Sequence, residues 1–421
     1  MQGVNVNAKD TLYSIGKYKE EELSYLEKSY NSKNEKDGFV VAGKYLSSKD
    51  KSTKKYQATL IKYNYQGEVV WEYKFENAPE INALTYTYSV ENTIDGYLVM
   101  AKEKLNEEEN EKNKIFKISL KGELVWEKEV NLSQDATMIR VLPVIKENNE
   151  FSNYIGIANS SEKAYLVAYS KEGELLWSKE QDANFLYKDL IVISDNEKDL
   201  GYVAILENKE TSQLIKYNLT GDVSKVLNSN LGKIDSNYLT SEKNGFILYG
   251  KTDEVKVKSG SVSYYLKKYD NEGIEKWETV GNTAIREENK IKLISSLNKN
   301  DEITGYLLLY INNEDNSLEV VKISSDGLIG KKIKKIINDY YFINDFQMKN
   351  NTLYFTGYIT CPEDDDCGYD THSLFLISDE DKVIEVKEDD NQKILIVGVA
   401  FILLIMATVI IRKKKKKLTN N

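Results

Sequence analysis

The residues with the clearest potential for chemistry lie near the C-terminal end, in the segment Cys361-Pro-Glu-Asp-Asp-Asp-Cys367. These are the only two cysteines of the 421 residues, and their spacing of six closes a small loop. The spacing differs from the CxxC pattern of metal sites. In an oxidising compartment we therefore expect a disulfide between Cys361 and Cys367.

Acidic side chains between and after the two cysteines offer oxygen ligands to a hard cation. Asp364, Asp366 and Asp370 are the candidate metal ligands, since calcium prefers carboxylate and carbonyl oxygens. The segment lacks the glycine at position six and the final glutamate of an EF-hand loop. We rank a solvated acidic loop above a calcium site and expect no other cofactor.

The chain has a single histidine, His372, which excludes metal sites built from several histidines. We expect it in an exposed loop rather than in a catalytic role. Because no set of nucleophile, acid and base emerges from the sequence, we predict no catalytic residue.

A repeat of about 50 residues organises most of the chain. Every tryptophan follows a glycine by four residues, as in Gly122-Glu-Leu-Val-Trp126, and a glycine-free seventh copy fits at Ser378 to Ile384. One side chain at one offset indicates one structural position built repeatedly. The repeated glycines are Gly67, Gly122, Gly173, Gly221, Gly273 and Gly327, and the tryptophans are Trp71, Trp126, Trp177 and Trp277.

Each repeat unit contains four predicted strands. A glycine-aromatic pair such as Gly96-Tyr97 opens an apolar run, and short alternating runs bounded by Asp-Gly or Lys-Gly are typical of strands joined by hairpins. A shift of 58 residues aligns Leu23 with Ile81 and Leu26 with Leu84, which adds a strand upstream. Residues 17–28 favour a helix by intrinsic preference, but the alignment predicts a strand.

Seven four-stranded units over residues 20–388 predict an all-β fold, a β-propeller with seven blades, or eight in the alternative count. A solenoid is the competing architecture, although solenoid repeats are usually shorter. In a propeller the repeated glycine supplies a positive φ angle to a hairpin, and the tryptophan fills the space between blades.

The stretch from Leu60 to Tyr73 resembles the tryptophan-docking blade of the PQQ-like, quinoprotein-type β-propellers, and it is echoed at residues 165–179 and 265–277. The segments 37–43 and 95–101 are similar to repeats of exported bacterial surface proteins and lipoproteins. Repeats four and six depart from this pattern, with Lys225 and Lys331 at the tryptophan position. No residue set matches a quinone site, so the resemblance implies a fold and no enzymatic activity.

Residues Ile394 to Ile411 are 18 consecutive uncharged residues, about 27 Å of helix, which is enough to span a bilayer. We predict a transmembrane helix there, a juxtamembrane linker at 389–393 and a basic tail at 412–421. Six cations follow the span, so the positive-inside rule places the tail in the cytoplasm and the propeller outside the cell membrane.

The first 19 residues contain no signal peptide of the usual form. A shift of 58 residues places Tyr13 on Trp71, so residues 9–16 are expected to form the last strand of a unit. Either Met1 is an internal start, with a signal lost upstream, or this strand closes the ring. A tail-anchored propeller facing the cytoplasm is the alternative if the chain starts at Met1.

With the six cations of the tail left out, the net charge of −10 becomes −16, which argues against nucleic acid as a partner. We predict a non-enzymatic binding or scaffold module with an extracellular protein or glycan partner. The alternatives are an envelope-assembly scaffold and a propeller enzyme, quinoprotein-like or glycan-active. The enzyme hypothesis requires polar residues that converge on the ring axis, and an apolar axis would count against it.

Overall fold

The computed structural model describes residues 12–14, 21–47, 55–89, 91–103, 112–130, 132–133, 135–145, 150–182, 184–195, 198–228, 237–242, 244–253, 261–286, 290–297, 303–315, 317–336, 340–349, 352–360 and 371–377. All regular structure in these residues is β-strand. The fold class is therefore all-β, as predicted.

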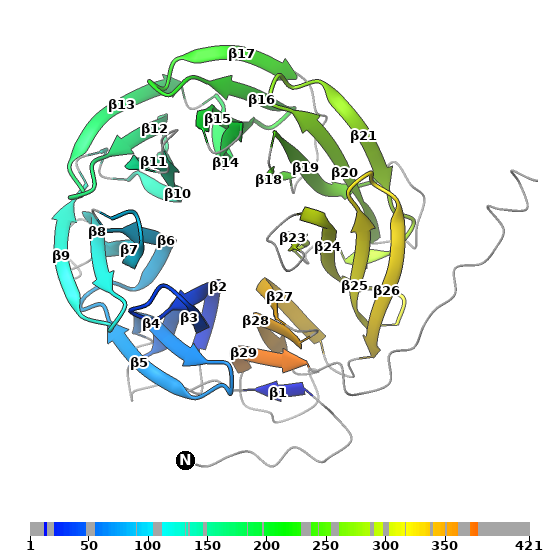
Figure 1. The fold of residues 1–421 in the computed structure, drawn as a ribbon, viewed down its shortest axis with the longest axis horizontal. Coiled ribbons are helices and arrows are strands. Elements are labelled where there is room, and N and C mark those ends of the chain that lie inside the picture. The colour runs from blue at the N-terminus through cyan, green and yellow to red at the C-terminus, as the bar shows by residue number, and fades with distance from the viewer. Residues whose placement is uncertain are drawn as a thin grey trace, which may run out of the picture. The chain divides into compact units, whose positions relative to one another are not determined.

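In four of the sheets consecutive strands pair antiparallel, and the first strand is innermost and the fourth is outermost (Figure 1). The first sheet contains β2 (Glu21–Tyr30), β3 (Lys36–Leu46), β4 (Tyr56–Asn64) and β5 (Val69–Lys74). The second contains β6 (Glu80–Tyr88), β7 (Ile94–Glu103), β8 (Lys112–Ser119) and β9 (Leu124–Glu129). The third contains β10 (Thr137–Ile145), β11 (Phe151–Asn159), β12 (Lys163–Tyr169) and β13 (Leu175–Asp182). The fourth contains β14 (Leu186–Asp195), β15 (Lys198–Glu207), β16 (Ser212–Tyr217) and β17 (Val223–Asn228).

The next two repeat units share one nine-stranded sheet. Its strands are β18 (Asn237–Glu242), β19 (Gly245–Thr252), β20 (Ser261–Asp270), β21 (Glu275–Val280), β22 (Ile285–Arg286), β23 (Lys292–Leu297), β24 (Ile303–Asn312), β25 (Ser317–Ser324) and β26 (Ile329–Ile336). The two-residue strand β22 pairs with both β20 and β24 and so joins the two units. Six sheets are therefore found in the described residues, and the prediction of seven separate blades is corrected to six.

The last sheet is built from both ends of the described chain. It holds β27 (Tyr340–Lys349), β28 (Thr352–Thr360) and β29 (Thr371–Ile377), with β1 (Leu12–Ser14) paired to β29 at its outer edge. β1 thus occupies the place for which the repeat predicts residues 378–384, which lie outside the described residues. Its pairing with β29 is the ring-closing arrangement considered for the N-terminal segment.

The first strand of the first sheet, β2, is a strand and not a helix, as the repeat alignment predicts. Leu26 pairs with Val41 and Leu84 with Val99, each three residues after the glycine of the glycine-aromatic pair, which confirms the alignment. The repeat outweighs helix preference because each apolar position must meet the same neighbours in every unit.

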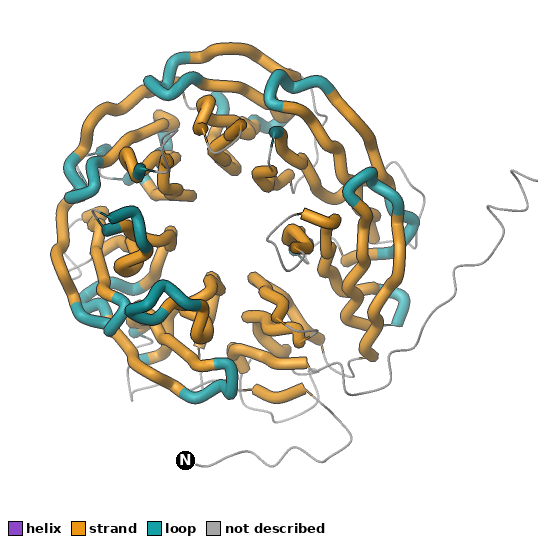
Figure 2. The backbone as a smooth tube through the Cα atoms, viewed as in Figure 1, coloured by secondary structure: helices purple, strands orange, loops and turns teal. Residues whose placement is uncertain are grey.

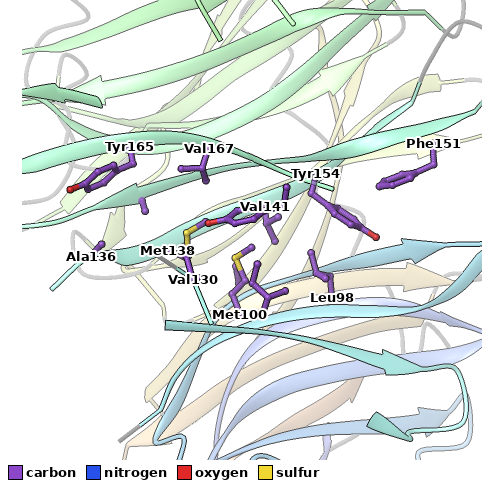
Figure 3. Close-up of a cluster of buried hydrophobic side chains, with 14 residues drawn as sticks. Leu98, Met100, Val130, Ala136, Met138, Val141, Phe151, Tyr154, Tyr165 and Val167 are labelled. Carbon is purple, nitrogen blue, oxygen red and sulfur yellow. The ribbon is translucent and has the colours of Figure 1, made fainter. Parts of the chain in front are cut away.

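Apolar side chains fill the space between neighbouring sheets. Between the second and third sheets, Leu98 and Met100 face Val141, Tyr154 and Val167 (Figure 3). Burying each such side chain contributes about 1.5–3 kcal/mol. The sheets of residues 12–377 therefore pack face to face in a ring, with the strands of each sheet following one another from the centre to the rim (Figure 2). The chain is a β-propeller.

No helix in the described ranges is long and apolar enough to cross a membrane. The predicted span at 394–411, the linker at 389–393 and the tail at 412–421 lie outside those ranges.

Candidate functional site

The repeated glycines occupy the turn between the third and fourth strand of each unit. All six have a positive φ between 78° and 86°, a conformation that side chains with a Cβ rarely adopt. Each tryptophan lies on the turn glycine of the following unit: a Cβ added at Gly173 would lie 2.6 Å from the ring of Trp126. Trp71 also donates its indole N–H to the carbonyl of Leu120 at 2.9 Å.

At the fourth unit two residues take over this docking. Leu227 contacts Gly273, where an added Cβ would lie 2.4 Å from Leu227, and Lys225 donates to the carbonyl of Glu272 at 3.0 Å. The apolar contact and the N–H donor of a tryptophan are thus supplied by separate side chains. In the sixth unit, Lys331 is exposed on β26.

The chemical candidates of the C-terminal segment mostly lie outside the described residues. Cys361, Cys367, Asp364, Asp366 and Asp370 fall in the gap between β28 and β29. His372 lies on β29 rather than in a loop, and its backbone pairs with Tyr358. Within the described part of the chain, no three His, Cys, Asp or Glu side chains could hold a metal ion.

The structure instead brings charged residues together at the ring axis. The innermost strands β2, β6, β10, β14, β18, β23 and β27 surround the centre (Figure 1). On each of these strands, we call axial the position directly before a buried apolar residue such as Leu26 or Leu190. In ring order the axial positions hold Tyr25, Ala83, Arg140, Asp189, Tyr238, Lys292 and Asp345.

Asp189 connects three successive sheets. Its Oδ1 accepts hydrogen bonds from Arg140 Nη1 at 2.6 Å and from the amide of Leu190 at 2.8 Å. Its Oδ2 accepts from the amide of Leu239, in the next sheet, at 2.7 Å. The carboxylate is buried, with 3% of its side chain exposed, and both of its oxygens are engaged.

Asp345 repeats this arrangement where the ring closes. Lys292 Nζ lies 3.0 Å from Oδ1, which also accepts from the amide of Phe346 at 2.8 Å. Oδ2 accepts from the amide of Leu26, in the first sheet, at 3.2 Å. The order cation, aspartate, tyrosine therefore occurs twice around the axis. Ala83, the seventh axial residue, belongs to neither set of three.

The two cations of the axis remain accessible. The side chain of Arg140 is 37% exposed and that of Lys292 is 36% exposed. Burial lowers the pKa of Lys292, but the charge of Asp345, the neighbouring Tyr249 and the hydrogen bond to Asp345 together raise it above its ordinary value. Burial likewise lowers the pKa of Arg140, and Asp189, Tyr249 and Glu27 together raise it. Both side chains therefore carry a positive charge at the axis.

Glu27 adds a third carboxylate, two residues after Tyr25 on β2. Burial raises the pKa of Glu27, and the charge of Asp345 raises it further, whereas Lys292 lowers it. Its Oε2 accepts from the hydroxyl of Tyr86 at 3.1 Å. Burial and Asp345 also raise the pKa of Tyr25 to about 12. The axial cluster, defined as Tyr25, Glu27, Arg140, Asp189, Lys292 and Asp345, is thus electrostatically coupled across the ring.

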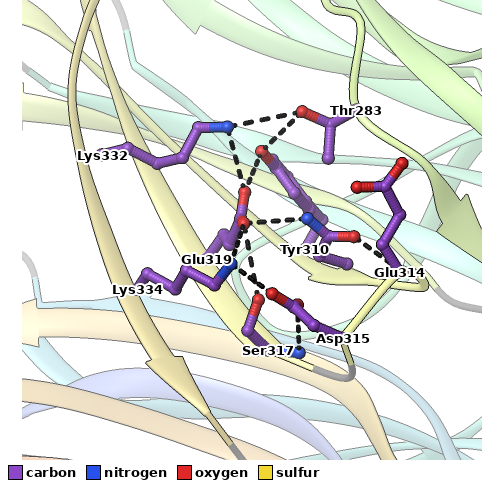
Figure 4. Close-up of polar contacts among 9 residues, drawn as sticks. Thr283, Tyr310, Glu314, Asp315, Ser317, Glu319, Lys332 and Lys334 are labelled. Carbon is purple, nitrogen blue, oxygen red and sulfur yellow. Dashed lines mark hydrogen bonds and ion pairs between the residues drawn. The ribbon is translucent and has the colours of Figure 1, made fainter. Parts of the chain in front are cut away.

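A second polar cluster lies away from the axis and is fully committed to packing (Figure 4). Glu319 is 2% exposed and accepts from Tyr310 at 2.6 Å and Asn312 at 2.9 Å. Lys332 Nζ lies 3.2 Å from its Oε2. Because this buried carboxylate is neutralised and hydrogen-bonded on both oxygens, it stabilises the sixth unit and offers no free group for chemistry.

Sequence reasoning did not find the axial cluster. One signal was present: Arg140 is one of three arginines in a chain rich in lysine, and it stands inside the apolar run from Met138 to Val144. A charged residue in a buried strand requires a partner.

No family model matches the chain, and no curated protein matches it. Among solved structures, it is similar to the β-propeller domain of the Trilobed protease from Pyrococcus furiosus, at 12% identity over 88% of this chain and 100% of that chain, with a TM-score of 0.46. It is also similar to the WD40 domain of SCAP from fission yeast, at 8% identity over 87% of each chain, with a TM-score of 0.47. A prolyl endopeptidase matches at 7% identity over 80% of this chain and 46% of that chain, with a TM-score of 0.47. At these identities the likeness concerns the fold alone.

Proposed function

We propose that this chain is a membrane-anchored β-propeller, displayed outside the cell, that binds or organises a partner without catalysing a reaction. The observation that carries this proposal is the engagement of Asp189 and Asp345. Each is held on both oxygens by its own sheet and the next one. A carboxylate so engaged stabilises the ring and is not available as an acid or base.

Exposed aliphatic pairs on three consecutive outer strands favour a protein as that partner. These rim pairs begin two residues after the turn glycine, and their second members are 54–55% exposed. Apolar side chains exposed together are typical of protein interaction surfaces. The rim pairs are Val69 with Val70, Leu124 with Val125, and Leu175 with Leu176.

The test is affinity purification of the full-length chain from crosslinked membranes. A triple variant, Val70→Ser, Val125→Ser and Leu176→Ser, should lose a partner that the wild-type chain retains. Val226→Ser, at a 50% exposed position of β17, is the matched control and should retain it. Retention by the triple variant, or no partner at all, would contradict the proposal.

The topology can be tested by labelling with a membrane-impermeant maleimide, with Cys361 and Cys367 replaced by serine. A cysteine at Val226→Cys should react on intact cells, and one at Leu418→Cys only after permeabilisation. The opposite pattern would place the propeller in the cytoplasm.

A second candidate, a glycan-active enzyme, is favoured by the polar axis, where Glu27 has a raised pKa near Arg140. Its test is turnover of glycan substrates by the wild-type chain, abolished in Glu27→Gln. The quinoprotein alternative and the envelope-assembly scaffold have no residue that singles them out.

A further inference from the structure

The outer edge of the last sheet is covered over only part of its length. β29 has seven residues, and β1 pairs with the last three, Phe375 to Ile377. The outermost strands of the other units are six to eight residues long, whereas β1 has three. Within the described residues, Thr371 to Leu374 thus have no partner strand at this edge. An edge of this kind accepts a further strand through its backbone N–H and C=O groups.

The register places β1 where an outermost strand belongs. In the first and last sheets, the residue after the axial position pairs with the second strand at an equivalent point. Counted from these pairs, Leu376 in β29 stands where Lys62 stands in β4. Tyr13 pairs with Leu376 as Trp71 pairs with Lys62, so β1 brings an aromatic residue to the tryptophan position. The pairs that fix the count are Leu26 with Val41 and Phe346 with Phe355.

The chain directly after β29 has the sequence of the same outermost strand. Before each outermost strand of the first six units, a polar side chain caps the turn by accepting a hydrogen bond from the amide four residues later, at 2.9–3.2 Å. Ser378 stands at this position, and Val383 and Ile384 stand where the rim pair of Val69 and Val70 stands. This segment therefore fits a turn and the start of a fourth strand. The capping residues are Asn64, Ser119, Ser170, Asn218, Asp270 and Ser324.

Each of the two segments lacks one part of the repeat pattern. Asp381 stands at the place of the turn glycine, where φ is positive, and aspartate adopts this conformation more readily than most residues. Glu385 stands at the tryptophan position, so the C-terminal segment has no aromatic residue there. β1 has the aromatic residue Tyr13 but only three paired residues. Neither segment matches the outermost strands of the other units in full.

We propose that the outer edge of β29 is a docking site for either of two segments of this chain, β1 or residues 378–384, and that the two exchange. In the second state Val383 takes the place of Leu12 opposite Ile377, as Val69 stands opposite Tyr63 in the first sheet. Six residues connect β1 to β2 and five connect Ile377 to Val383. Because these connections are similar in length, loop closure favours neither state.

The exchange changes the surface that the proposed partner meets. Docking of residues 378–384 adds Val383 and Ile384 as a fourth rim pair, in the sheet next to that of Val69 and Val70. The row of rim pairs is then longer by one unit. This consequence rests on the proposed function, whereas the exchange itself does not.

Hydrogen exchange of the full-length chain in detergent detects the second state. Leu12→Pro together with Tyr13→Pro removes β1, because proline has no N–H and two adjacent prolines include whichever amide faces β29. We expect the amides of residues 378–384 to exchange about threefold or more slowly, since the second state becomes more populated. Asn5→Pro with Val6→Pro, upstream of β1, is the control and should exchange as wild type. Unchanged or faster exchange in residues 378–384 would overturn the proposal.

Urea unfolding tests whether the two segments replace each other. Val383→Pro with Ile384→Pro prevents the second docking. Each pair of prolines alone should lower the urea midpoint little, because the other segment still closes the sheet, whereas all four together should lower it by more than the sum. Additive losses would overturn the exchange. A dimer formed by the chain without β1 would assign the edge to a second copy and would also overturn it.

Both measurements are made without a partner. A chain that loses its partner in the rim triple variant but shows additive losses refutes this inference and leaves the proposed function standing. A chain that captures no partner but shows the slowed exchange and the larger combined loss refutes the proposed function and leaves the strand exchange standing.

Discussion

Outer strands β5, β9, β13 and β21 carry a tryptophan at the same place, whereas the innermost strands hold five residue types at their equivalent axial position. Each tryptophan packs on the turn glycine of the next unit, so the same side chain fits at each of these junctions between units. The inner positions have different neighbours: Asp189 and Asp345 pair with cations, whereas Ala83 is buried in the core between the second and third sheets. The repeated glycine and tryptophan positions therefore mark packing between units, whereas each axial residue is set by its own neighbours.

The fourth unit refines this comparison. A lysine in place of a tryptophan suggests that the packing rule is relaxed there for another purpose. The structure gives a simpler reason, because Leu227 and Lys225 together reproduce the contacts of a tryptophan. A departure from the repeat at the outer edge is therefore no sign of a site.

The largest expected effect is at the axis. Asp189→Ala would leave Arg140 and two backbone amides without their acceptor, and we expect a loss of about 3–5 kcal/mol in the free energy of unfolding. Urea unfolding of the full chain measures it. Asp222→Ala, which removes an exposed pair, should leave the midpoint unchanged, and an equal midpoint for both variants would contradict the difference between axis and rim.

A smaller loss is expected at the outer turns. Gly173→Ala combines a positive φ of 80° with a clash against Trp126, so it should cost about 1–3 kcal/mol. In a Trp126→Ala background the clash disappears and only the backbone strain remains. A double-mutant cycle by urea unfolding should therefore show coupling between the two residues, and additive losses would refute the docking contact.

The loss of stability should be smaller still at the junction after the fourth unit, where Leu227 and Lys225 stand in for a tryptophan. Leu227→Ala is expected to cost about 1 kcal/mol and Lys225→Met less than about 0.5 kcal/mol, because the lysine contact is exposed. Thermal unfolding can rank the two. A larger loss for Lys225→Met would show that the lysine has a role beyond the hydrogen bond to Glu272.

The last effect concerns pH. Burial raises the pKa of Asp199 from 3.8 to about 6, although a hydrogen bond from the Ile145 amide acts to lower it. The folded state then binds more protons than the unfolded state between these values, so stability from this group falls as pH rises through that window. Asp199→Asn should flatten the pH dependence between about pH 4 and 6, measured by urea midpoints, and an unchanged slope would contradict it.

The sequence predicted the outer half of each sheet better than the inner half. Gly122 and Trp126 recur at a fixed offset, so alignment alone located their strands and turns. The axial residues do not recur. Arg140, Asp189 and Asp345 each follow a register shift in the innermost strand, and their pairing joins residues 49 to 53 positions apart. No single-sequence pattern reports such contacts.

The blade count shows a second limit. The repeat counts units, whereas sheets are counted by hydrogen bonds, and β22 merges two units into one sheet. The alignment of Tyr13 with Trp71 predicts that the N-terminal segment can close the ring, but its partner strand β29 is identified only in three dimensions.

The most direct test of the account compares the triple rim variant Val70→Ser, Val125→Ser and Leu176→Ser with Asp189→Ala. We predict that the rim variant loses the captured partner and keeps the urea midpoint of the wild-type chain, whereas Asp189→Ala lowers the midpoint. A rim variant that keeps the partner, or an Asp189→Ala chain with an unchanged midpoint, would contradict the claim that the axis holds the ring together and the rim binds the partner.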